Sequence, residues 1–90
     1  MLETVKKALR VKTTAYDSEL EYLIDAAKLD LGVAGVVLPA ELDALVTKAV
    51  VTYCKMSFGI PEDYDRLKMS YDEQKAQLVT ATGYTNWGDA

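Results

Sequence analysis

The chain has 90 residues, half of them apolar, and its 10 basic and 14 acidic side chains give a formal net charge of −4. A chain of this length forms one domain with a modest core, and its acidic balance argues against general affinity for nucleic acid. There is no basic-then-apolar leader and no apolar run near the ~18 residues of a membrane span, so we expect a soluble protein made in the cytoplasm.

The chain lacks the usual proton shuttle of enzymes that act near neutral pH. The chain has no histidine, so its single cysteine, Cys54, has no imidazole to activate it. No glycine-rich phosphate loop and no metal-ligand spacing occur. We therefore expect no enzymatic activity, no cofactor and no bound metal. Cys54 lies in the most apolar stretch and is interpreted as a small core residue of a protein in a reducing compartment.

The first predicted helix covers residues 2–9, where apolar residues recur every three or four positions. The other face of this helix and the residues just after it carry the only basic cluster of the chain. The simpler interpretation is a solvated face with cations near a helix C-terminus. The alternative is contact with an acidic partner or a phosphate backbone. The cluster consists of Lys6, Lys7, Arg10 and Lys12.

The second predicted helix covers residues 18–31. Ser18 and Glu21 have the spacing of a capping box, and Gly32 suits the left-handed conformation that ends a helix. The apolar link from Val33 to Leu38 has two interpretations. It forms an internal turn under the core, which the nearby proline favours, or it is exposed and covered by another copy of the chain.

The third predicted helix, residues 40–58, is the one against which the others pack. Its apolar residues have helical spacing but cover much more than one face, which is typical of a central helix. Pro39 suits the first turn of this helix, and Gly59 followed by Pro61 stops it at the other end.

The fourth predicted helix, residues 62–80, begins with three carboxylates that oppose the positive end of the helix dipole. A narrow seam then follows at three- and four-residue spacing. Other apolar residues lie away from the seam, so we expect this helix to touch both its own core and a neighbouring subunit. The candidate subunit interface consists of Tyr64, Leu67, Tyr71 and Gln74.

The last residues depart from the helical pattern at Gly83 and form a short polar segment that contains Tyr84 and Trp87. Aromatic side chains in such a tail either fold back onto the domain or bind a partner, and both interpretations stay open. We thus expect an all-α bundle of four helices over residues 1–82, with an extended tail over residues 83–90.

The order of these features resembles the small head-to-tail connector proteins of tailed bacteriophages, the adaptor family that is also labelled phage DNA-packaging proteins. The segments that carry the resemblance are the N-terminal helix ending in LRV, then SELEYLIDAAKLDL, the central helix with its tyrosine, PEDYDRLKMSYDEQKAQL and the closing GYTNW.

The resemblance implies an all-α subunit of the virion neck, made in the host cytoplasm before assembly. Such subunits form a ring, commonly twelvefold, beneath the portal protein, and DNA passes through the ring without specific binding. A tail-completion or stopper protein binds on the other side. The tail residues Tyr84 and Trp87 are then the candidates for contact with the portal. The competing hypothesis is a small helical DNA-binding regulator or antitoxin-like protein that uses the basic cluster.

Overall fold

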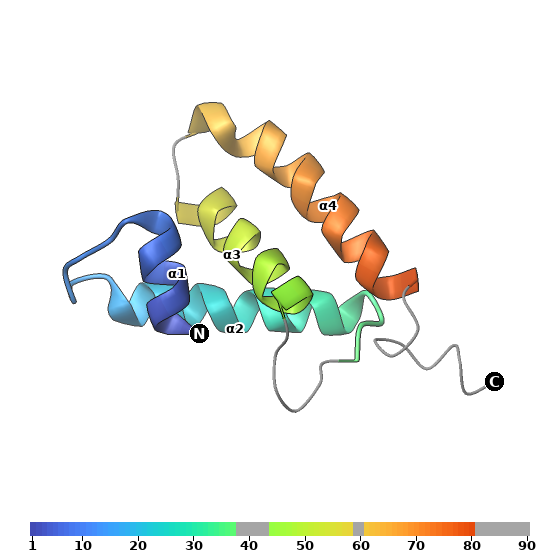
Figure 1. The fold of residues 1–90 in the computed structure, drawn as a ribbon, viewed down its shortest axis with the longest axis horizontal. Helices are drawn as coiled ribbons and strands as arrows, with labels where there is room; N and C mark the ends of the chain where they lie inside the picture. The colour runs from blue at the N-terminus through green and yellow to red at the C-terminus, as the bar shows by residue number, and fades with distance from the viewer. Residues whose placement is uncertain (38–43, 59–60, 81–90) are drawn as a thin grey trace.

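The computed structural model describes residues 1–37, 44–58 and 61–80, and in these residues it contains helices and no strand (Figure 1). The all-α prediction is confirmed. Residues 40–43 of the third predicted helix, and the tail with Tyr84 and Trp87, lie outside the described residues. The elements are α1 (Leu2–Leu9), α2 (Asp17–Val33), α3 (Ala44–Phe58), a 3-10 turn η1 (Pro61–Asp63) and α4 (Tyr64–Thr80).

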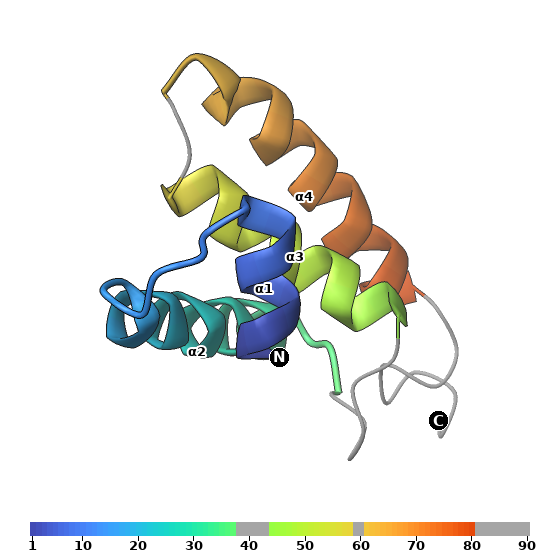
Figure 2. The same cartoon turned by 60° about the vertical axis from the view of Figure 1, so that its left-hand side comes forward.

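Helix α3 is the centre of the bundle, as its broad apolar surface predicts. It contacts each of the other three α-helices. Helix α4 returns alongside α3 in the opposite direction, and α1 crosses α2 at a steep angle in both views (Figures 1 and 2). The core is formed by the fully buried side chains of all these elements, among them Val5, Leu20, Leu31, Val46, Val50 and Cys54.

Two edge-to-face aromatic pairs fasten the periphery to this core. The rings of Tyr53 on α3 and Tyr71 on α4 lie 5.4 Å apart between centroids, and those of Tyr16 and Phe58 lie 5.3 Å apart. Such pairs add about 0.5–1.5 kcal/mol to the burial of their area. The segment before α2 is therefore held against the C-terminal end of α3.

The start of α2 differs from the prediction. The helix begins at Asp17 with Tyr16 at its N-cap, and no side chain caps it. Ser18 is thus already inside the first turn, and the capping box predicted for Ser18 and Glu21 is wrong. A polar turn ahead of the helix, in which the Asp17 N–H donates to the carbonyl of Thr14 at 3.2 Å, sets the earlier start.

The end of α2 also differs, because the helix continues through Gly32 to Val33. The left-handed residue is Gly35, with φ 100°. The Gly35 N–H donates to the carbonyl of Gly32 and the Val36 N–H to that of Leu31, both at 3.0 Å, which is a Schellman motif. The helix ends there because this turn brings Val36 into the core, where it is 4% exposed.

The link after α2 is partly buried and partly exposed, and its contact with another copy stays a prediction. Val36 is buried under the core, whereas Val33 is 87% exposed and Val37 is 45% exposed. None of the described helices is long and apolar enough to span a membrane.

Candidate interaction surfaces

The basic cluster is smaller than the sequence predicts, because Lys6 does not lie on the solvated face. It is only 8% exposed, and its Nζ lies 2.8 Å from Oδ1 of Asp17 at the start of α2. A cation buried against α2 needs this carboxylate partner. Lys6 therefore holds α1 against α2, and the exposed members of the cluster are Lys7, Arg10 and Lys12.

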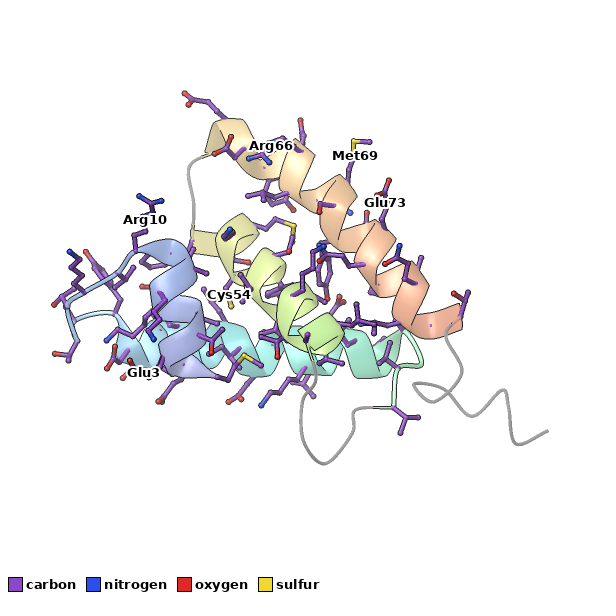
Figure 3. All side chains as sticks on the ribbon, in the orientation of Figure 1. Glu3, Arg10, Cys54, Arg66, Met69 and Glu73 are labelled. Atoms are coloured by element: carbon purple, nitrogen blue, oxygen red, sulfur yellow. The ribbon has the colours of Figure 1, made fainter. Side chains whose placement is uncertain are left out.

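Arg10 has an unusual backbone conformation for its residue type. Its φ is 59°, in the left-handed region, and it ends α1 in a second Schellman motif, in which the Val11 N–H donates to the carbonyl of Lys6 at 2.9 Å. Glycine usually takes this position, since a β-carbon there is disfavoured. The side chain projects away from the bundle at the end of α1 (Figure 3).

The four residues of the candidate subunit interface are not equally available to a neighbour. Tyr64 is 43% exposed, whereas Tyr71 is 2% exposed and belongs to the core of the single chain. Leu67 and Gln74 are half-buried. A subunit contact through this seam therefore has Tyr64 as its most accessible member, and Tyr71 offers it no surface.

Tyr71 instead joins α4 to α2. Its hydroxyl donates to Oδ2 of Asp30 at 2.6 Å, and Nζ of Lys75 donates to the same oxygen at 3.2 Å. Lys75 Nζ also lies 5.2 Å from the centroid of the Tyr71 ring. Burial raises the pKa of the Tyr71 hydroxyl, and the bond to Asp30 raises it further, so the hydroxyl stays a donor.

The same contacts act on Asp30 in the opposite direction. Burial by itself raises the pKa of the carboxyl, but the hydrogen bonds from Tyr71 and Lys75 and the charges of Lys75 and Lys68 outweigh it. The net pKa of Asp30 is below its ordinary value of 3.8. The carboxylate is therefore ionised at neutral pH and serves as the acceptor between two helices.

Helix α2 carries a second apolar face that the sequence analysis missed. Tyr22 is 72% exposed, Leu29 71% and Val33 87%. Together with the half-buried Ala26 they recur at spacings of four, three and four residues, which places them on one side of a helix. This side lies opposite the buried face formed by Leu20, Ile24, Ala27 and Leu31. We call Tyr22, Ala26, Leu29 and Val33 the α2 stripe.

A second unpartnered surface lies where the start of α3 meets the C-terminal half of α4. It is a hollow lined by two leucines, two glutamines and a lysine, and Leu45 at its edge is 54% exposed. Oε1 of Gln74 is buried there and accepts no hydrogen bond from the described residues. We call this surface the α3–α4 hollow; it consists of Leu45, Lys48, Gln74, Gln77 and Leu78.

The described residues contain no cluster of three or more residues suited to hold a metal ion. Cys54 is fully buried, and this burial raises the pKa of its thiol to about 11. The side chain points inward between the helices (Figure 3). The interpretation of Cys54 as a core residue is confirmed.

Comparison with known protein families identifies a family for this chain. The family described as "Phage connector protein" matches residues 1–85, which is nearly the whole chain. No curated protein and no solved structure matches the chain. The family is one of structural proteins of the phage neck, in agreement with the resemblance seen in the sequence.

Proposed function

The chain belongs to the phage connector protein family, and from this premise we propose that it is a head-to-tail connector subunit that forms a ring under the portal. In this role it continues the DNA channel toward the tail. The observation that carries the proposal is the family match over residues 1–85. The match supports a structural role in phage assembly, and the ring is the proposed form of that role.

The surfaces of the domain support assembly into a larger structure. A closed ring needs two different complementary surfaces on each subunit, so that one side of each copy meets the other side of the next. A monomeric domain rarely leaves contiguous apolar residues on its surface. This chain exposes the α2 stripe on one helix and Leu45, which is 54% exposed, on another.

The proposed partners are the portal protein, a tail-completion or stopper protein, and further copies of the chain. The formal charge of −4 suits a channel wall past which DNA slides without being held. No catalytic step is part of this role. The competing role of a DNA-binding regulator depends on the basic cluster, and the ion pair of Lys6 with Asp17 takes one cation out of that cluster.

The tail residues Tyr84 and Trp87 are proposed to bind the portal. They lie outside the described residues, and the proposal rests on their residue types, since aromatic anchors dominate many interfaces. The test compares the full chain with a variant lacking residues 83–90 in co-sedimentation with purified portal rings. We expect the full chain to co-sediment and the shortened chain to bind much more weakly. Equal binding would remove the tail from the account.

A DNA gel shift, done beside the co-sedimentation, separates the two candidate functions. A connector subunit binds portal rings and leaves duplex DNA unshifted even at low salt. A regulator that uses Lys7, Arg10 and Lys12 shifts duplex DNA in a gel, and the shift weakens as salt rises. A strong salt-dependent shift without portal binding would overturn the connector proposal.

A further inference from the structure

The α2 stripe has the length and the regular spacing of one side of a helix–helix contact. From Tyr22 to Val33 it covers twelve residues, and its two ends lie about 16 Å apart along the helix. Exposed apolar residues scattered singly need no explanation, but these share one side of the helix at the spacing of a packing seam. Such a seam is typical of a contact with a partner that has a matching apolar surface.

The charges beside the stripe indicate what kind of surface that partner has. Glu19 lies one helical turn before Tyr22, and Asp25 lies between Tyr22 and Leu29 on the helix surface. Both carboxylates are exposed, and neither forms an ion pair with a described residue. The matching surface is thus apolar with a cation at its edge.

The α3–α4 hollow has these properties. Leu45, which is 54% exposed, supplies the apolar part, and Lys48 supplies an exposed cation that forms no ion pair with the described residues. Helix α3, from Ala44 to Phe58, contains two lysines and no carboxylate, so nothing on that helix repels an acidic partner. The exposed amide of Gln77 adds a hydrogen-bonding group for a hydroxyl such as that of Tyr22.

Within one copy these two surfaces do not meet. Helix α2 packs its buried face on α3, and no residue of the stripe lines the hollow. We infer that the α2 stripe of one copy binds the α3–α4 hollow of the next copy, head to tail. This inference rests on the proposed ring and names the two surfaces that close it.

Cysteine cross-linking tests the inference, and the chain is suited to it. The native Cys54 is fully buried and does not compete for a thiol reagent near neutral pH. We would mix full-length Leu29→Cys with full-length Leu45→Cys at high concentration and add a short bismaleimide. The expected result is a covalent dimer in the mixture and little dimer from either variant alone, since a head-to-tail contact brings different surfaces together.

The matched control replaces Leu45→Cys with Met69→Cys. Met69 is 68% exposed, comparable with Leu29, and points outward from α4 (Figure 3). This pair is expected to give no dimer above background. Dimer from Leu29→Cys alone would show stripe-to-stripe contact and overturn the inference, as would equal yields with Met69→Cys. The inference is also overturned if Leu29→Cys and Leu45→Cys associate in the mixture but form no covalent dimer.

A second readout uses charge in the stripe. Leu29→Asp is expected to weaken self-association about tenfold or more, because it buries an unpaired carboxylate in the contact, whereas Met69→Asp leaves it unchanged. Both sites are exposed, so both variants keep the wild-type melting temperature.

If rings form on the portal without the Leu29–Leu45 cross-link, this inference fails and the connector role stands. If the cross-link forms but the portal recruits no chain, the connector role fails and the contact stands.

Discussion

Tyr71 shows how one residue ties the outer helix α4 to α2. Its hydroxyl bonds to Asp30 from inside the core, where the ring is 2% exposed. We expect Tyr71→Phe, which keeps the ring and its packing on Tyr53, to lower the free energy of unfolding by about 1 kcal/mol. The magnitude is modest because the Asp30 side chain is 38% exposed. Urea unfolding monitored by circular dichroism gives the value.

The control for Tyr71→Phe is Arg66→Ala. Arg66 forms an exposed ion pair with Asp63 at 3.5 Å, in which the two side chains are 72% and 44% exposed. Exposed pairs of this kind contribute little, so the variant should unfold like the wild type. A larger loss from Arg66→Ala than from Tyr71→Phe would contradict the assignment of the α2–α4 link to Tyr71.

The Asp30 carboxylate also gives this link a pH dependence. Since the pKa of Asp30 is lower in the folded state than its ordinary 3.8, its stabilising contribution is complete above that value. It is lost as the pH falls from 3.8 through the lower folded-state pKa. The stability difference between the wild type and Tyr71→Phe should therefore be constant from pH 7 to pH 5 and shrink in acid. A difference that shrinks already between pH 7 and pH 5 would contradict this.

The left-handed backbone conformation of Arg10 gives another prediction for a single residue. With φ 59°, its backbone is strained for any residue with a β-carbon, by about 1 kcal/mol. We expect Arg10→Gly to raise the free energy of unfolding by about that amount and Arg10→Ala to leave it nearly unchanged, because alanine keeps the strain. Thermal unfolding of the two variants distinguishes the backbone from the charge. Equal stabilisation by both would assign the effect to the guanidinium.

At the scale of the elements, the end of α2 depends on which glycine is left-handed. Gly32 is helical, and a β-carbon built on it meets no atom within 4 Å, whereas Gly35 has φ 100°. Gly32→Ala should therefore stabilise the protein by about 0.5–1 kcal/mol. Gly35→Ala should destabilise it by about 1 kcal/mol or more. Chemical unfolding of this pair checks the helix end, and the opposite order would place the end at Gly32.

Helix positions could be predicted from the sequence because apolar spacing and the breakers around them are local signals. The central role of α3 followed in the same way from its broad apolar surface. The ends of α2 could not be predicted, since they depend on tertiary contacts. Val36 entering the core decides that Gly35, and not Gly32, ends the helix. At the other end, the turn from Thr14 makes Asp17 the first helical residue.

The same limit applies to the candidate site residues. The sequence predicts Lys6 as a surface cation, because it does not show that Asp17 lies 2.8 Å away. It likewise predicts Tyr71 as part of an outer seam, although the residue is buried in the folded bundle. The α2 stripe was present in the sequence as a second three-four repeat. It was missed because the inner face of α2 had already accounted for a buried helix.

At the scale of the whole molecule, we propose that this small bundle is complete only within an assembly. The core is closed by the four helices, yet apolar side chains such as Leu29 and Val33 remain 71% and 87% exposed. In the ring that we propose, these side chains are covered by the neighbouring copy. In the same proposal, association with the portal as template stabilises the ring by mass action.

Electron microscopy of portal rings incubated with excess full-length chain tests this claim most directly. The account predicts a closed ring of added density, coaxial with the portal and on its tail side, in which each copy touches two neighbours through different surfaces. Portal rings that show no added density, although circular dichroism shows the chain to be folded, would contradict it.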